Sequence, residues 1–375
     1  MSEQTIDSAT LDRWLREPGE LAVLDIRPEA EFERHGSPLF ASNIPADQLD
    51  RKISERVPRR GVRVVLVDGG DGTSTRNAAG LQAQGYTDVH VLEGGLPAWI
   101  QSAFRTTFSV SAPQYTDQVW EKLGTPAVQA SELNELYQSG ADVVVLDSRT
   151  VEEYARGHVP GAISVPGGEL IQRFADLVPS PETLVLVSCA GNPRGVIGAQ
   201  TLRNARVPNR VAVLEEGTKG WQKAGLELEV GLQRTFGPVS RNGAKLGAGW
   251  AARLEREYGV KSIDDTALAR WISEGEHVTT YLLDVRTPEE YEEWHVPGSI
   301  CAPGGQLILG TLRYVSVRGA RLVLIDDTGI RAITTAHWLR QRGWDVRVHR
   351  IDAAAEALEP RNLATTSARA SQLGA

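Results

Sequence analysis

The feature of this sequence that most constrains its fold is a pattern that occurs three times. Each copy has an apolar run that ends in Leu-Asp-x-Arg, at residues 24–27, 146–149 and 283–286. A second apolar run follows in each copy and leads to Asp68, Cys189 or Asp326, which lie 43, 42 and 42 residues after the aspartate of the first run. Nearly equal offsets between two separate motifs indicate repeated domains.

The order of elements within each copy predicts the fold class. After the second apolar run come a glycine-containing loop, a helical stretch and another short apolar run. Strands that alternate with helices predict a parallel sheet with helices on both faces, and about 100 residues suffice for one such domain. We therefore predict an α/β protein made of three tandem domains.

The predicted boundaries follow from this repetition. The two segments between the repeats each hold a short amphipathic stretch, around Trp120 and Trp250, and we expect these stretches to be helices that pack against the domains. We place repeat one at 1–106, a linker helix at 107–124, repeat two at 125–232, a second linker helix at 233–260, repeat three at 261–358 and a disordered tail at 359–375. Repeat three lacks the Gly-Gly…Trp closure of the first; loss of a further repeat and a shortened chain would both account for this, and the sequence leaves them open.

Composition and charge exclude several classes of partner. The net charge is −8 and no run is rich in Lys or Arg, so we expect neither nucleic acid nor an anionic membrane surface as a partner. No apolar run approaches the ~20 residues of a membrane span, and the N-terminal residues do not resemble a signal peptide, which predicts a cytoplasmic protein. Two cysteines do not make a disulfide framework.

The segment around Cys189 predicts a reactive thiol. This cysteine leaves a strand, and the residues after it open a helix, whose first N–H groups attract anions. They should favour the thiolate, so we expect the pKa of Cys189 to lie below its ordinary value. Arg194 adds a positive charge, and Gly191 and Gly195 should permit turns and close approach of the backbone.

Four pieces together resemble the rhodanese-like family over nearly all of the chain. They are the Leu-Asp-x-Arg strand ends, the Gly-His-Val-Pro-Gly-Ala turn at 157–162, the Cys189 loop and the Gly-Thr-x-Gly-Trp closure at 217–221. The resemblance implies persulfide chemistry, in which Cys189 takes sulfane sulfur from a small donor such as thiosulfate and passes it to cyanide, a thiol or a protein acceptor. The implied substrate-binding loop is Ala190, Gly191, Asn192, Pro193, Arg194 and Gly195. Neither metal-ligand spacing nor a nucleotide loop occurs, so we expect no metal and no cofactor.

Two details of the loop bear on the reaction. Arg194 stands five positions after the cysteine, whereas cysteine phosphatases need an arginine one position later, where Gly195 stands. This length favours sulfur transfer over dephosphorylation. Some family members carry a further basic residue inside the loop, and its absence at 190–193 leaves open weak use of thiosulfate or a different donor.

Other recurring residues are interpreted as structural support. Asp147 and Arg149 recur in all three copies, which predicts a buried ion pair or hydrogen-bond anchor of the shared fold. His158 recurs at the same turn of repeat three, where no nucleophile follows, so we expect it to stabilise the turn. Trp221 should anchor the closing helix, and Cys301 is interpreted as core filler.

Asp68 and Asp326 cannot carry a persulfide but are good helix N-caps. We therefore expect repeats one and three to be inactive and to act as scaffold, as a wall of the Cys189 pocket, or as a docking site. Two alternatives stay open: a non-catalytic binding or regulatory protein, favoured by two inactive copies, and a phosphatase or reductase of the loop-cysteine type.

Overall fold

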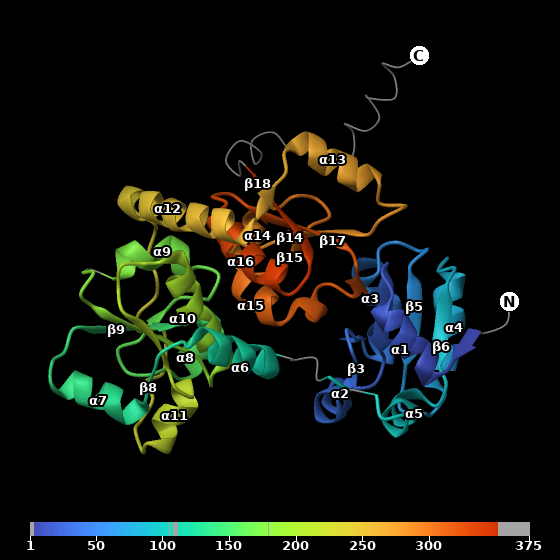
Figure 1. Cartoon of the computed structure of the whole chain (residues 1–375), viewed down its shortest axis with the longest axis horizontal. Coiled ribbons are helices and arrows are strands. Elements are labelled where there is room, and N and C mark those ends of the chain that lie inside the picture. Colours follow the sequence, from blue (N-terminus) through green and yellow to red (C-terminus); the bar gives the residue numbers. More distant parts are fainter. Residues whose placement is uncertain (1–3, 105, 108–111, 179, 352–375) are drawn as a thin grey trace, which may run out of the picture.

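The structure is a computed structural model that describes residues 4–104, 106–107, 112–178 and 180–351. Three α/β units follow one another along the chain, and the third lies in contact with both others (Figure 1). The predicted class, three tandem domains with sheets flanked by helices, is confirmed. The predicted tail at 359–375 lies outside the described residues.

Repeat one forms a sheet in which four parallel strands run in the order β1-β6-β5-β2, with β4 also paired to β2. Strand β2 is buried along its whole length, as expected of a strand covered on both faces. Its strands are β1 (Gln4–Ile6), β2 (Leu21–Asp25), β3 (Ser37–Pro38), β4 (Ser42–Asn43), β5 (Arg63–Val67), β6 (Val89–Leu92) and β7 (Thr106–Thr107); its helices are α1 (Ser8–Arg16), α2 (Glu29–His35), α3 (Ala46–Arg56), α4 (Thr73–Ala83) and α5 (Gly95–Gln101).

Repeat two has an entirely parallel sheet in the order β10-β9-β11-β12-β8. Strands β9 and β11 lie at its centre, so the residues that follow them meet at one edge. Its strands are β8 (Ala127–Val128), β9 (Val143–Asp147), β10 (Ile163–Ser164), β11 (Leu184–Ser188) and β12 (Val211–Leu214); its helices are α7 (Ala130–Gln138), α8 (Val151–Arg156), α9 (Leu170–Leu177), α10 (Pro193–Ala205) and α11 (Gly217–Lys223).

Repeat three has the same parallel order, β13-β18-β17-β14-β15. Its last strand, β18, corresponds to the short apolar run that follows the helical stretch of the repeat. Its strands are β13 (Lys261–Ser262), β14 (Thr280–Asp284), β15 (Ile300–Cys301), β16 (Val317–Arg318), β17 (Arg321–Asp326) and β18 (Asp345–Arg350); its helices are α13 (Asp265–Ser273), α14 (Pro288–Glu293), α15 (Gly304–Leu309), the 3-10 turn η1 (Thr311–Arg313) and α16 (Ile330–Gln341).

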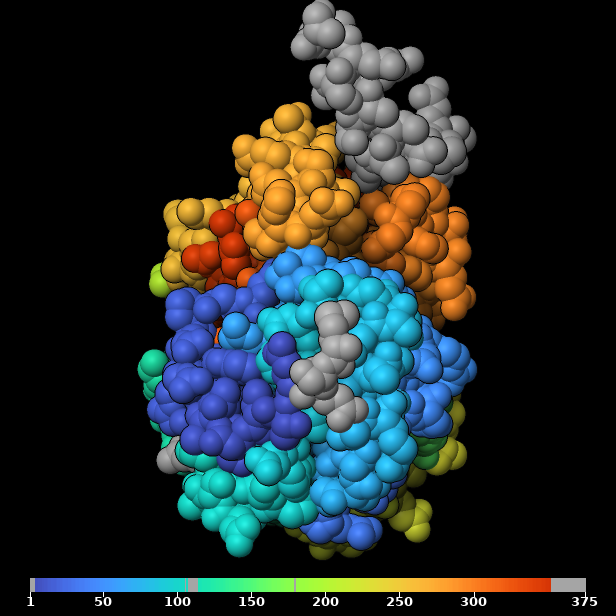
Figure 2. All heavy atoms as spheres, turned by 90° about the vertical axis from the view of Figure 1, so that its right-hand side faces the viewer, coloured from blue at the N-terminus to red at the C-terminus, as the bar shows by residue number. Residues whose placement is uncertain are grey.

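One short strand of repeat three joins the sheet of repeat one. Strand β16 of repeat three pairs antiparallel with β2 of repeat one, with Val317 opposite Ala22. Figure 2 shows the surfaces of the two repeats in continuous contact, repeat one in blue and cyan below repeat three in orange. The sequence could not predict this pairing, because β16 is a two-residue strand between repeats far apart in the chain.

The repeats also share hydrophobic cores. One cluster combines Ala22 and Val64 of repeat one with Tyr281 and Val317 of repeat three. A second cluster combines residues of repeat two with repeat three, where the buried Trp338 donates from Nε1 to Thr201 Oγ1 at 2.8 Å. Because burial of apolar area is the main stabilising term in folding, repeat three stabilises the position of both neighbours.

The helices α6 (Ala112–Leu123) and α12 (Arg241–Tyr258) lie within the segments predicted as linker helices. Helix α6 packs against α10, and α12 packs against α9 and α16, so neither stands free. Across the part of the chain that the structure describes, no helix is both long enough and apolar enough to cross a membrane.

Candidate active site around Cys189

Cys189 lies directly after β11 and before α10, at the edge of the sheet where the parallel strands end. Its backbone is fixed by Thr218, whose N–H donates to Cys189 O at 2.8 Å. Gly217, with a φ of 50°, passes so close that a Cβ there would lie 1.9 Å from Cys189 O. Only glycine fits this approach, so the Gly-Thr-x-Gly-Trp closure positions the cysteine.

The Cys189 thiol is buried, with 1% of its surface exposed. Its Sγ donates to Gly191 O at 3.0 Å and accepts from Gly191 N at 3.4 Å. Burial raises the pKa of Cys189, and the N–H groups of Gly191 and Gly195 and the charge of Arg194 lower it only in part. The expectation of a lowered pKa was wrong for this state of the site, because the loss of hydration outweighs the amides that favour the thiolate.

The loop is shorter than the sequence indicated. Helix α10 begins at Pro193, not near Gly195, because proline lacks an N–H and its fixed φ suits the first helical position. Arg194 therefore lies in the first turn of the helix. Asn192 ends the loop, and its Oδ1 accepts from Glu216 N at 2.7 Å, which ties the loop to the start of α11.

The two glycines of the loop differ in how closely other atoms pack against them. A Cβ on Gly195 would lie 3.2 Å from Val187 O and 3.6 Å from Cys189 Sγ, so a side chain there would press against the end of β11 and require a small shift of its neighbours. A Cβ on Gly191 would meet nothing within 4 Å. The expectation that Gly191 permits a close approach of the backbone was therefore wrong.

Arg194 is held by a carboxylate of its own repeat. Its Nη1 and Nη2 atoms donate to Glu153 Oε2 and Oε1 at 2.5 and 2.8 Å. The hydrogen bond from Arg194 lowers the pKa of Glu153 to about 2. Glu153 also forms a capping box with Thr150 at the start of α8, a spacing that the sequence could have revealed.

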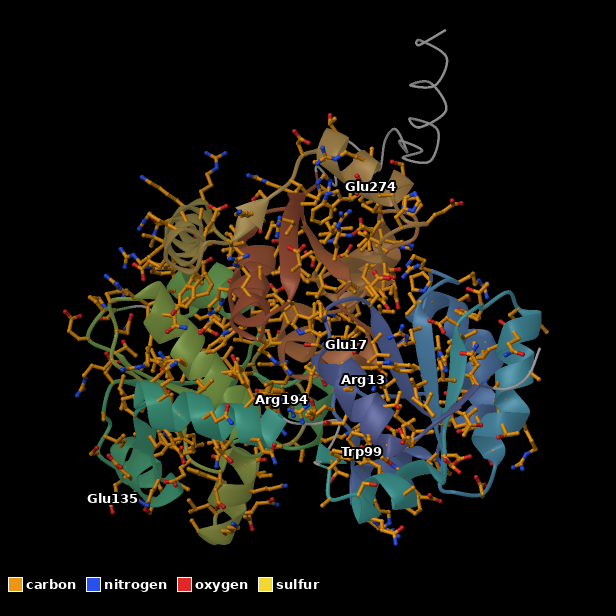
Figure 3. All side chains as sticks on the ribbon, turned by 45° about the vertical axis from the view of Figure 1, so that its right-hand side comes forward. Arg13, Glu17, Trp99, Glu135, Arg194 and Glu274 are labelled. Carbon is orange, nitrogen blue, oxygen red and sulfur yellow. The ribbon has the colours of Figure 1, made fainter. Side chains whose placement is uncertain are left out.

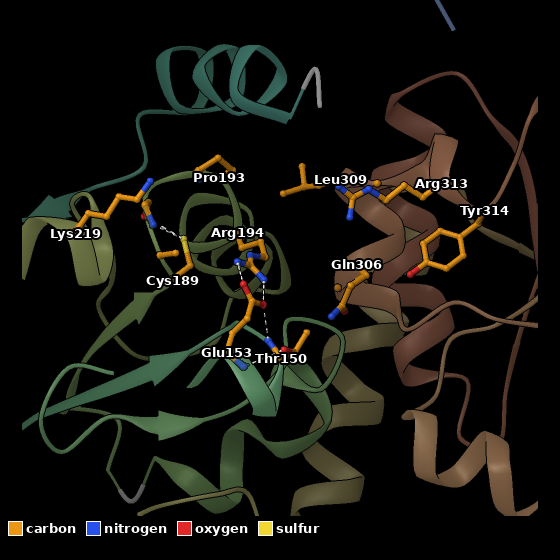
Figure 4. A pocket seen from close by; sticks show the side chains of 14 residues that line it. Thr150, Glu153, Cys189, Pro193, Arg194, Lys219, Gln306, Leu309, Arg313 and Tyr314 are labelled. Atoms are coloured by element: carbon orange, nitrogen blue, oxygen red, sulfur yellow. Dashed lines mark hydrogen bonds and ion pairs between the residues drawn. The ribbon is translucent and has the colours of Figure 1, made fainter. Parts of the chain in front are cut away.

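A cavity of about 520 Å³ opens beside the thiol, between repeats two and three (Figure 4). Repeat three supplies one wall through α15 and η1, while no described residue of repeat one lines the cavity. Figure 3 shows Arg194 near the centre of the molecule, whereas Glu135 of the same repeat lies at the periphery. The lining residues are Thr150, Glu153, Cys189, Ala190, Gly191, Pro193, Arg194, Lys219, Gly305, Gln306, Leu309, Gly310, Arg313 and Tyr314.

Several polar residues of this cavity were not predicted from the sequence, among them Lys219, Gln306 and Arg313. Lys219 is the variable position of the closure motif, and Gln306 and Arg313 come from repeat three. Neither cation forms an ion pair with a carboxylate of the described chain. No signal in the sequence assigned Gln306 and Arg313 to the site, because they follow Cys189 by more than 100 residues and belong to a repeat without a nucleophile.

The recurring Asp and Arg form a buried ion pair in each repeat. In repeat two, Arg149 Nη2 lies 2.7 Å from Asp147 Oδ2 and also donates to Gly157 O at 2.7 Å. Pairs of the same geometry join Asp25 with Arg27 and Asp284 with Arg286. Presence in all three copies assigns the pair to the shared fold, where it ties the strand end to the following turn.

The remaining predicted support residues, His158 and Trp221, do not line the cavity. His158 is buried, stacks on Tyr154 at 3.7 Å and makes a 3.0 Å hydrogen bond through Nδ1 with Tyr154 O. Trp221 is buried and donates to Glu227 O at 2.8 Å. Cys301 is half-buried in β15, and burial raises its pKa.

The aspartates that stand in place of the cysteine in repeats one and three accept hydrogen bonds from N–H groups of the residues that follow them. Asp68 accepts from the N–H groups of Gly70 and Ser74 at 2.9 and 2.8 Å. Asp326 accepts from Arg331 N at 3.0 Å and forms an ion pair with the side chain of Arg331 at 2.9 Å. Each carboxylate thus occupies the N–H groups that an anionic ligand would need. Among the residues that the structure describes, no cluster of His, Cys, Asp and Glu could hold a metal.

These features define a class of protein: tandem α/β repeats with a cysteine cradled between a strand end and a helix start. The profile of the Rhodanese-like domain matches residues 8–102, 129–224 and 264–353, well over half of the chain. The chain therefore belongs to the rhodanese-like domain family.

Several relatives support this membership. The crystal structure of a thiosulfate sulfurtransferase from Pseudomonas aeruginosa is similar with a TM-score of 0.88 and 44% sequence identity, over 92% of this chain and 66% of that one. A curated "Thiosulfate sulfurtransferase" of Pseudomonas aeruginosa is 36% identical over 117 residues, 27% of this chain and 40% of that protein. The "HTH-type transcriptional regulator Rv0324" of Mycobacterium tuberculosis is 36% identical over 112 residues, 29% of this chain and 48% of the regulator. The chain thus spans under half the length of these two curated relatives.

Proposed function

We propose that this protein is a sulfurtransferase in which Cys189 carries sulfane sulfur as a persulfide. The observation that supports this most is the position of the Cys189 thiol, between loop amides and an open cavity. An anion on sulfur at this point would accept hydrogen bonds from the N–H groups of Gly191 and Gly195. Ala190, Asn192, Pro193 and Arg194 complete the proposed binding loop.

The proposed reaction has two transfers at sulfur. The Cys189 thiolate attacks the outer sulfur of thiosulfate, a sulfur–sulfur bond forms, and sulfite leaves with the electron pair of the broken bond. A cyanide ion or a thiolate then attacks the outer sulfur of the persulfide and takes it as thiocyanate or as a new persulfide. Cys189 leaves as the thiolate, so no net oxidation occurs and no cofactor is required.

The three repeats take different parts in this proposal. Repeat two, at 125–232, carries the reaction, and repeats one and three, at 1–106 and 261–358, are not catalytic, because Asp68 and Asp326 cannot hold a persulfide. Repeat three forms a wall of the cavity, and repeat one acts as scaffold. The donor class is a small anionic sulfur compound, because Lys219 and Arg313 line the cavity.

A binding or regulatory role is the second candidate. It is favoured by the buried state of the thiol, whose pKa is raised by the loss of hydration. In this role the cavity would hold a ligand, and Cys189 would pass no sulfur on. The two functions differ in whether a persulfide forms.

Intact-protein mass spectrometry after incubation with thiosulfate tests the proposal. We expect wild type to gain one sulfur atom and to lose it to cyanide, with release of thiocyanate. Cys189→Ala should gain none, while the matched variant Cys301→Ala should behave as wild type. Absence of the adduct with thiosulfate and with other sulfane donors, in protein whose Cys189 reacts with alkylating agents, would support the binding role.

A further inference from the structure

Two equivalent four-residue segments, one from repeat two and one from repeat three, contact each other where these repeats meet. These segments are Pro166–Glu169 and Pro303–Gln306, whose glycines face each other. A Cβ on Gly168 would lie 3.2 Å from Gly305 N, and a Cβ on Gly305 would lie 3.0 Å from Gly168 N. The two segments thus contact each other reciprocally, as across an approximate two-fold axis.

This reciprocal contact places the fourth residue of each segment at the loop of the other repeat. Glu169 of repeat two reaches the Asp326 loop, where its Oε1 accepts from Arg331 Nη1 at 3.0 Å. Gln306 of repeat three lines the cavity of the Cys189 loop, and its side chain extends toward Arg194 and Thr150 (Figure 4). Arg331 and Arg194 are equivalent, since each stands five positions after Asp326 or Cys189.

The two sites differ in how their arginine is neutralised. Arg331 forms ion pairs with four carboxylates, those of Asp326, Asp327, Glu169 and Glu290. Among the described residues, Arg194 pairs with Glu153 alone, which is the counterpart of Glu290. The Asp326 site is therefore closed to anions by these four carboxylates, three from repeat three and Glu169 from repeat two. At the Cys189 site, an uncharged amide stands at position 306, which is equivalent to Glu169.

We propose that Gln306, supplied by the Cys-lacking repeat three, is a specificity-determining residue of the Cys189 site that keeps the site open to anionic reactants. Its amide group can donate to an anion at the thiol, whereas a carboxylate at this position would repel the anion and compete for Arg194. Lys219 and Arg313, on the two sides of the cavity, add positive potential. The identity of the anionic reactant rests on the proposed function. The predicted charge selectivity of the site does not.

Charge selectivity at Cys189 can be measured without turnover. Iodoacetate and iodoacetamide alkylate the same thiolate and have nearly the same shape, but only iodoacetate is an anion. The ratio of their rates at Cys189 cancels any change in the pKa of the thiol and reports the potential at the site. A Cys301→Ala background leaves Cys189 as the one cysteine of the sequence.

In this background we expect Gln306→Glu to lower the iodoacetate to iodoacetamide ratio roughly three- to thirtyfold, because it places a negative charge in the cavity. Gln306→Met, similar in length but without donors, should lower the ratio less. Glu169→Gln, the reciprocal change at the inactive site, should leave the ratio unchanged. In the sulfur-transfer assay, Gln306→Glu should raise KM for thiosulfate more than it lowers kcat.

An unchanged ratio in Gln306→Glu, or an equal change in Glu169→Gln, would overturn the inference. Iodoacetamide reacts with the same protein sample, so its rate shows whether the variant keeps a folded, accessible site. If the ratio falls as expected but wild type forms no persulfide, the proposed function fails while the role of Gln306 in charge selectivity stands. If the persulfide forms but the ratio is unchanged, the role of Gln306 fails alone.

Discussion

Arg194 donates to both carboxylate oxygens of Glu153, at 2.5 and 2.8 Å, so the cation in the first turn of α10 is paired before any substrate arrives. Arg194 lowers the pKa of Cys189, but burial outweighs it. The ion pair therefore sets how much positive potential the thiol experiences. In repeat three the equivalent residues, Arg331 and Glu290, also pair, through a single hydrogen bond, which indicates that the pair belongs to the shared loop and not to catalysis alone.

Glu153→Gln should make Cys189 more reactive. The substitution frees the charge of Arg194, which lowers the pKa of the thiol, while a glutamine at this position still completes the capping box with Thr150. We expect alkylation of Cys189 by iodoacetamide at pH 7 to become roughly threefold to tenfold faster, with a rate–pH profile displaced to lower pH. Glu152→Gln makes the same charge change at an exposed neighbour and should leave the rate unchanged. An equal rate in wild type and Glu153→Gln would show that the pair does not control the thiol.

Gly217→Ala should disrupt the cysteine loop. The new Cβ would lie 1.9 Å from Cys189 O at a φ of 50°, so the backbone must move. We expect a loss of about 1–3 kcal/mol in the free energy of unfolding and little persulfide formation. Gly191→Ala is the control, because its Cβ meets nothing within 4 Å and its stability should change by less than about 0.5 kcal/mol. Equal thermal denaturation midpoints for the two variants would contradict the assignment of Gly217.

Arg318→Ala tests the scaffold role of repeat one. Arg318 of repeat three donates to the carbonyl groups of Trp14, Leu15 and Glu17 at the end of α1, at 3.0, 3.1 and 2.6 Å. Since a cation at a helix C-terminus is favourable, its loss should cost about 1–3 kcal/mol of stability. Persulfide formation on folded protein should stay unchanged, because no described residue of repeat one lines the cavity.

The control for Arg318→Ala is Arg13→Ala, which removes a cation from the exposed face of the same helix (Figure 3). An exposed ion pair of this kind contributes at most about 1 kcal/mol. Slower sulfur transfer by Arg318→Ala at a temperature where the protein is folded would show that repeat one acts on the site.

His337 should make the protein sensitive to acid. This side chain is fully buried on α16 next to Tyr258, and burial lowers its pKa from 6.5 to about 3. Between these pH values the unfolded chain binds a proton that the folded chain does not, so stability falls as pH falls, by about 1.4 kcal/mol per pH unit. The contribution is absent above pH 6.5 and complete below about pH 3.

Thermal denaturation at pH 7 and pH 5 measures this effect. The melting temperature of His337→Phe should fall less between pH 7 and pH 5 than that of wild type. This holds whatever the stability of the variant at pH 7. His277→Phe, at an exposed position, should retain the wild-type response. The same loss in wild type and His337→Phe would exclude His337 as the cause.

The sequence alone determined the repeated architecture and the position of the candidate cysteine, Cys189, after the second apolar run of repeat two. The Leu-Asp-x-Arg motifs predicted strands that end in a buried ion pair or hydrogen-bond anchor. Charged groups at the end of a buried apolar run must be paired or hydrogen-bonded. The equal offsets to Asp68, Cys189 and Asp326 predicted equivalent loops, of which one holds a thiol. These are properties of segments of chain, and local spacing is sufficient to reveal them.

Only the tertiary structure decided the direction in which the pKa of the thiol is shifted and the composition of its cavity. The pKa of Cys189 depends on burial among residues from several elements, which no motif records. The pairing of β16 with β2, and the entry of Gln306 and Arg313 into the site of repeat two, depend on how whole repeats pack. Packing between repeats depends on how well many apolar surfaces, formed by residues far apart in the sequence, fit together. A single sequence does not reveal which of these surfaces come into contact.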